Sequence, residues 1–73
     1  MTAEEWVRRF ALEVGAEPPS DEELDQILKL ASIAAHASER KAAPVACWIA
    51  GRTDLSPEAL REVAKRINPA HED

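Results

Sequence analysis

Residues 20–38 read SDEELDQILKLASIAAHAS, and this stretch decides the fold class. Ser20 stands three residues before Glu23, the spacing of a capping box in which each side chain accepts a hydrogen bond from the other residue's backbone N–H. Apolar residues then cover two adjoining faces of the expected helix: Leu24, Ile27, Leu28, Leu30, Ala31, Ile33, Ala34, Ala35 and Ala37. A helix that is apolar around so much of its circumference is expected to have neighbours on more than one side. We therefore predict a central helix over residues 21–38.

Three further helices are predicted around it. Thr2 and Glu5 form a second capping box before an apolar face spaced by three and four residues, and Gly15 can end that helix in the left-handed conformation. Pro44 suits the first turn of a helix, because it has no N–H to leave unpaired there. Ser56 is a good N-cap for the last segment. The expected ranges are 2–14, 44–50 and 57–67.

These segments predict an all-α fold, a compact four-helix bundle with short loops. Residues 1–73 are expected to form a single domain, with residues 1–2 and 69–73 frayed. No strand-like alternation of apolar and polar residues interrupts the helical pattern. The expected core consists of Trp6, Phe10, Leu24, Ile27, Leu28, Ala31, Leu60, Val63 and Ile67.

Composition excludes several classes of function. The 73 residues carry 14 acidic and 9 basic side chains, a formal charge of −5, which argues against nucleic acid or an anionic membrane as the main partner. The last helix mixes Arg61, Lys65 and Arg66 with two glutamates, unlike a basic recognition helix. One cysteine and no long apolar run predict a cytoplasmic protein without a disulfide or a membrane span.

Signals for catalysis are absent from the sequence. There is no glycine-rich phosphate loop and no zinc-binding motif, so we expect no enzyme activity, no cofactor and no metal site. Cys47 lies between Ala46 and Trp48, where a small core hydrophobe is the more economical interpretation than a nucleophile. A zinc site of His36, Cys47 and His71 would need three elements to converge without any motif spacing, and we reject it.

The turn between the second and third helices is the most informative polar segment. His36 and Arg40 stand one helical turn apart, and Ala43 before Pro44 offers no capping oxygen. In one hypothesis Glu39 caps the first N–H groups of the third helix, those of residues 45–47. In the other, the set His36, Glu39, Arg40 and Lys41 binds a small anion such as phosphate at those N–H groups.

Trp48 and Ile49 follow one another in a helix too short to bury both well. An exposed aromatic and aliphatic pair is typical of an interface, where tryptophan is a common anchor. We therefore predict that Trp48 and Ile49 contribute to a homodimer or to a surface that binds a partner protein.

The same segment carries a family resemblance. Ala-His at 35–36, Glu-Arg at 39–40, Ala-Ala-Pro at 42–44, Trp48 and Gly51, after Trp6 and Gly15, resemble a small uncharacterised family of helical domains found mainly in actinobacteria. Similar domains occur alone or fused to the C-terminus of molybdenum-cofactor guanylyltransferase-like proteins. The resemblance marks His36, Glu39, Arg40 and Pro44 as signature positions, and the chain departs from the pattern at Lys41 and at 46–48, where the family usually has Pro and Thr-Thr-Phe.

Two hypotheses for function follow. The first is a non-catalytic helical accessory or interaction module, which the resemblance links to the biosynthesis of the molybdenum cofactor (molybdopterin guanine dinucleotide). The alternative is a module that binds a small anion or phosphate ligand at the junction of the second and third helices.

Overall fold

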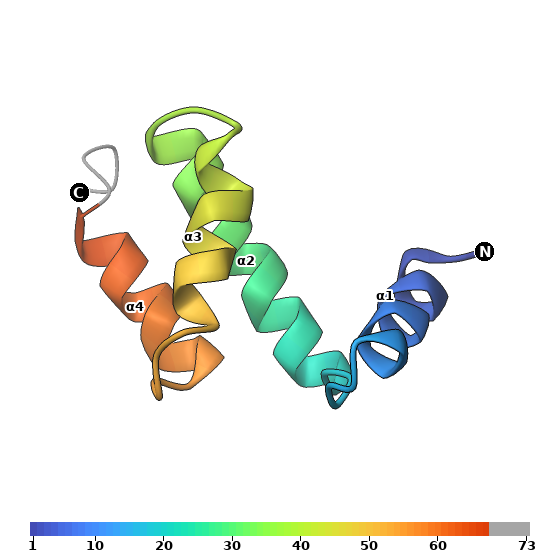
Figure 1. Ribbon diagram of the computed structural model, residues 1–73. Helices are drawn as coiled ribbons and strands as arrows, with labels where there is room; N and C mark the ends of the chain where they lie inside the picture. Colours follow the sequence, from blue (N-terminus) through green and yellow to red (C-terminus); the bar gives the residue numbers. More distant parts are fainter. Residues whose placement is uncertain (68–73) are drawn as a thin grey trace.

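The computed structural model describes residues 1–67 as four helices in chain order, α1 (Ala3–Glu13), α2 (Asp21–Ala37), α3 (Ala42–Ala50) and α4 (Pro57–Ile67) (Figure 1). No strand occurs among these residues. The predicted all-α class and the four-helix arrangement are confirmed. The prediction of frayed residues 69–73 lies outside the described part of the chain.

The sequence signals for the starts of α1 and α2 and for the end of α1 are confirmed at atomic detail. The Thr2 hydroxyl accepts from the Glu5 N–H at 3.0 Å, and the Glu5 carboxylate accepts from the Thr2 N–H at 2.9 Å. Ser20 and Glu23 repeat this capping box at the start of α2 with the same two distances. Gly15 has a φ of 80°, the left-handed conformation that favours glycine after a helix end.

The last helix starts as predicted, and the third starts earlier than predicted. The Ser56 hydroxyl accepts from the Ala59 N–H at 3.1 Å and so caps α4. Helix α3 begins at Ala42 rather than at Pro44, because the turn before it continues directly into helical backbone. The N–H groups of Ala42 and Ala43 donate to the carbonyls of Glu39 and Arg40, at 2.9 and 3.1 Å. A proline in the first helical turn is compatible with this start, because the N–H that it lacks has no partner within the helix.

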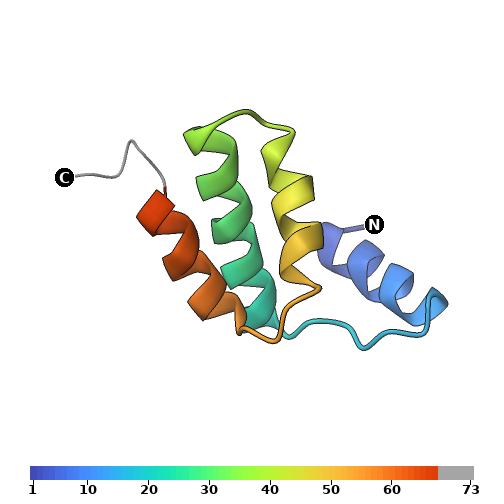
Figure 2. The same ribbon diagram turned by 60° about the vertical axis from the view of Figure 1, so that its left-hand side comes forward.

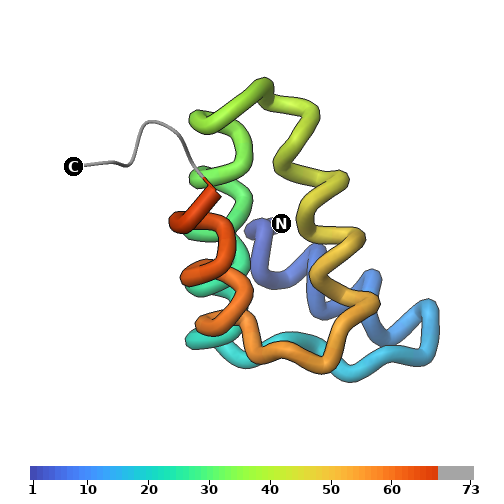
Figure 3. Tube along the Cα trace, turned by 90° about the vertical axis from the view of Figure 1, so that its left-hand side faces the viewer, coloured from blue at the N-terminus to red at the C-terminus, as the bar shows by residue number. Residues whose placement is uncertain are grey.

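Helix α2 lies in the middle of the packed part of the molecule, as its sequence predicted. It has extensive contacts with α3 on one side and α4 on the other, and Figures 2 and 3 show these three helices side by side. Leu30 of α2 is the most enclosed large side chain of residues 1–67, with 5% of its surface exposed. The other buried side chain of residues 1–67 is Ala11 of α1, with 8% of its surface exposed, so the described core is small and lies mainly on α2.

Helix α1 stands apart from this three-helix unit. Within residues 1–67 it shares no interface as extensive as those that α2 makes, and in Figure 1 it leans away from α2 beyond the connecting segment. Its Val7 meets Pro18, Pro19 and Leu24 around a small pocket near the start of α2. Consecutive prolines keep the connection extended, which holds α1 at the end of α2 instead of along its side.

This arrangement corrects the predicted core. Five of its members are exposed: Trp6, Phe10, Leu28, Val63 and Ile67. The other four, Leu24, Ile27, Ala31 and Leu60, are half-buried. The periodic spacing located the apolar face of each helix, but a helix covers that face only where a neighbour packs against it, and α1 does not fold back over α2 and α3.

Candidate functional site

The junction between α2 and α3 holds the predicted ligand-binding residues on the surface. The His36 ring turns back along its own helix, where Nδ1 lies 2.8 Å from the carbonyl oxygen of Ser32 and 3.2 Å from its hydroxyl. Because a carbonyl only accepts hydrogen bonds, Nδ1 carries the hydrogen in the shorter contact. One ring nitrogen is thus occupied within α2, and His36 does not reach across the turn.

The structure corrects the expectation that Glu39 caps α3. Helix α3 has no side-chain cap, and its first two N–H groups donate to backbone carbonyls of the turn. The Glu39 carboxylate instead lies 3.6 Å from the Lys41 ammonium, with both side chains largely exposed. The N–H groups of Ala42 and Ala43 thus have backbone acceptors in the turn, and no side chain caps α3.

Arg40 is exposed and forms no ion pair or side-chain hydrogen bond with any residue of the described chain. The four predicted ligand-binding residues, His36, Glu39, Arg40 and Lys41, therefore follow one another along the turn without converging on a shared pocket. The described chain also has no group of three or more His, Cys, Asp or Glu side chains placed to hold a metal ion. Binding of an anion at this junction stays a prediction.

The outer face of α3 is the exposed apolar surface that the sequence predicted at Trp48 and Ile49. Trp48 is 64% exposed, Ile49 is similarly open, and Val45 joins them on the same side of the helix. We call these three residues the α3 face. The Arg52 guanidinium lies 4.6 Å from the centre of the Trp48 ring, within reach of a cation–π interaction. The spacing 45, 48 and 49 is that of one helical face, and this signal could have added Val45 to the predicted pair.

Cys47 is half-buried, and the helical spacing places it off the α3 face. Burial raises the pKa of its thiol, because the low-dielectric surroundings disfavour the thiolate. A reactive cysteine needs the opposite shift. This agrees with the interpretation of Cys47 as a packing residue.

A second apolar surface, which the sequence placed in the core, lies on α1. The rings of Trp6 and Phe10 stack with their centres 5.2 Å apart and nearly parallel, yet more than half of each side chain is exposed. Beside α1 an open groove of about 310 Å³ runs along α2. Its lining combines the leucines 24 and 28 with the acidic residues Glu4, Asp21 and Asp25.

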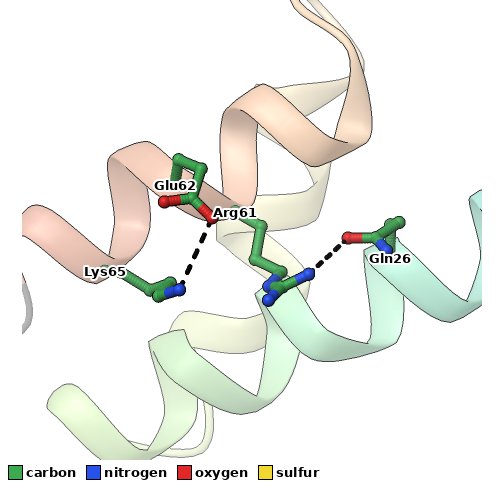
Figure 4. Close-up of polar contacts among 4 residues, drawn as sticks. All are labelled: Gln26, Arg61, Glu62 and Lys65. Atoms are coloured by element: carbon green, nitrogen blue, oxygen red, sulfur yellow. Dashed lines mark hydrogen bonds and ion pairs between the residues drawn. The ribbon is translucent and has the colours of Figure 1, made fainter.

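One polar residue of α4 contributes to the packing against α2. Figure 4 shows Arg61 of α4 donating to the side-chain oxygen of Gln26 on α2 at 2.9 Å, in a partly buried position. Lys65 and Glu62 pair along α4 itself at 3.4 Å. The mixed charges of this helix thus form a partly solvated face with one bond to α2.

Comparison with protein families gives one finding. The chain matches, over residues 1–72, a family described as a domain of unknown function (DUF6457). It belongs to this family. No curated protein and no solved structure matches the chain. The DUF6457 match therefore supports the predicted small uncharacterised domain and extends over nearly all of it. Within residues 1–67 of this DUF6457 domain, the helices are too short or too polar to cross a membrane.

Proposed function

We propose that this DUF6457 domain is a cytoplasmic, non-catalytic helical module that binds a partner protein through the α3 face. The observation that carries the proposal is Trp48, a large aromatic side chain with 64% of its surface open and two apolar neighbours on the same side of the helix. Tryptophan is among the residues that most often dominate the binding energy of an interface, and apolar clusters of this kind mark binding surfaces.

The chemistry of the described residues supports a binding role over a catalytic one. The only thiol is half-buried with a raised pKa, and the only described histidine is bonded to its own helix. The thiol has no base beside it among the described residues, and the His36 nitrogen near the Ser32 hydroxyl carries its own hydrogen, so neither forms an activated nucleophile–base pair. Binding through shape and apolar contact needs no such pair.

The family resemblance indicates which class of protein the partner belongs to. The resemblance implies that similar domains are fused to the C-terminus of molybdenum-cofactor guanylyltransferase-like proteins, a linkage that would hold the two close together. We therefore propose a protein of molybdenum-cofactor biosynthesis as the partner of the α3 face.

The test is direct binding between the purified full chain and a purified guanylyltransferase-like protein from the same genome, measured by calorimetry. We expect Trp48→Ala to weaken binding at least tenfold. Leu12→Ala is the matched control, because Leu12 is equally exposed but lies on α1. Absence of binding by the wild-type chain would remove the molybdenum-cofactor assignment, and equal losses in both variants would remove the α3 face as the contact.

The anion-binding alternative stays a second proposal, supported by Arg40. Its guanidinium is exposed and has no ion pair among the described residues, next to Lys41 on the same turn. Titration of the chain with inorganic phosphate, followed by NMR, is expected to shift the backbone signals of residues 39–43 in the wild type and not in Arg40→Ala. Equal shifts in both proteins, or none, would exclude this site.

A further inference from the structure

Helix α1 has an apolar side that nothing in the described chain covers. Trp6 and Phe10 lie one turn apart and stack on each other, but 56% and 53% of their surfaces are open. Stacking two rings on one helix hides only one side of each ring from water. An aromatic pair left this open, on a helix without an extensive interface to the other helices, is typical of a surface that binds a partner.

The groove beside α1 has an apolar and acidic lining, which complements an apolar helix that carries a positive charge. Its apolar lining comes from α2, where Leu28 is 60% exposed and Leu24 is half-buried. Glu4, Asp21 and Asp25 supply its charged lining. An occupant that suits this groove is a helix with large apolar side chains and at least one cationic side chain nearby.

Helix α1 itself meets this description. Arg9 stands one turn from Trp6 and carries the positive charge that the acidic lining favours. Its partner within the chain is Glu13, at 3.8 Å with both side chains largely exposed, a contact that is easily exchanged for another. The chain's α1 cannot occupy the groove that it borders, so the helix that fits must come from another molecule.

The surface area of the chain agrees with a second copy. A folded monomeric protein of 8.0 kDa is expected to expose about 4,500 Å², whereas this chain exposes 5720 Å². The excess of about 1,200 Å² is of the same order as the ~800 Å² that each partner buries in an interface of standard size.

We infer that two copies of this chain form a symmetric dimer in which each α1 enters the α1–α2 groove of the other. Trp6 and Phe10 of one copy pack on Leu24 and Leu28 of the other, and Arg9 faces the acidic lining. Because the dimer has a two-fold axis, the aromatic contact and the contact of Arg9 with the acidic lining each occur twice. This interface uses a different surface from the α3 face and goes beyond the proposed function.

The test is the mass of the full chain in solution, measured by sedimentation equilibrium over a range of concentrations. We expect the wild type to reach about 16 kDa, twice its chain mass of 8.0 kDa. Phe10→Asp and Leu28→Asp should each raise the dissociation constant of the dimer at least tenfold. Leu12→Asp is the matched control, because it places the same charge on the opposite side of α1 and should leave the dimer intact.

A charge exchange provides a second and independent measurement. Arg9→Glu and Asp25→Lys should each weaken self-association, and mixing the two variants should restore a dimer of one copy of each. Circular dichroism shows whether each variant keeps its helices, so a variant that fails to fold is recognised and set aside in favour of the other pair.

Three outcomes would overturn the inference. One is a wild type that stays monomeric at millimolar concentration, including the case in which it instead binds a synthetic basic amphipathic peptide. Another is an equal effect of Leu12→Asp and Phe10→Asp. The third is a dimer that Trp48→Asp dissociates while Phe10→Asp does not, which would place self-association on the α3 face and leave the α1 surface without this role.

Discussion

Helices α1 and α2 begin alike and end in different environments. Each starts with a hydroxyl N-cap and a glutamate three residues later, with the same pair of hydrogen-bond lengths. Helix α2 then packs against α3 and α4, whereas α1 leans away with its aromatic rings open. Good local signals are therefore enough to define a helix, and they do not decide whether it joins the core. The following measurements test that contrast.

Removing a side chain from the core of α2 should have the largest effect. Leu30→Ala is expected to lower the free energy of unfolding by about 3 kcal/mol, because Leu30 is almost fully enclosed and its truncation leaves a cavity. Phe10→Ala, measured at low micromolar concentration, should cost less than about 1 kcal/mol despite the larger truncation. Urea unfolding followed by circular dichroism gives both values. Similar losses would show that α1 is packed as firmly as α2.

The two capping boxes allow a closer comparison, because their geometry is the same. Ser20→Ala should reduce the free energy of unfolding by about 1 kcal/mol, since α2 unfolds together with the core that it organises. Thr2→Ala removes an equivalent bond from a short helix with little packing. It should lower helix content before the main transition and leave the midpoint of urea unfolding nearly unchanged. Equal shifts of the midpoint would contradict the separation of α1 from the three-helix unit.

Within that unit, the polar contact between helices should matter more than the contact along one helix. Arg61→Ala is expected to cost about 1 kcal/mol, because it breaks a partly buried hydrogen bond that joins α4 to Gln26 of α2. Lys65→Ala removes only a pair along α4 and should cost about 0.3 kcal/mol. Thermal unfolding of both variants separates these effects. A larger loss of stability in Lys65→Ala than in Arg61→Ala would show that the pair along α4 matters more than the bond between the two helices.

The smallest effect is expected at the turn before α3. Glu39→Ala should change the free energy of unfolding by less than about 0.3 kcal/mol, because Glu39 makes only an exposed ion pair with Lys41. A true cap at this position would contribute about 1 kcal/mol. A loss of that size in urea unfolding would restore Glu39 as the cap of α3.

The sequence by itself determined the helices of this protein. Caps at Thr2, Ser20 and Ser56 act on their own first turn, and Gly15 relieves a local backbone constraint, so their effects depend on neighbours within a few residues. The exposure of Trp48 and Ile49 was also predictable, because a nine-residue helix is too short to bury both side chains. The apolar residues on two adjoining faces of residues 21–38 likewise predicted the central position of α2.

The tertiary structure alone decided which apolar faces are covered. Trp6, Phe10 and Leu28 have the spacing of core residues, but burial depends on where the extended segment after Gly15 directs α1, which no periodicity records. The same holds for the turn before α3, where the helix starts at Ala42, its first two N–H groups donate to backbone carbonyls, and Glu39 is not a cap. Caps act over one turn of chain, whereas burial requires segments distant in sequence to meet, and that depends on the path of the whole backbone.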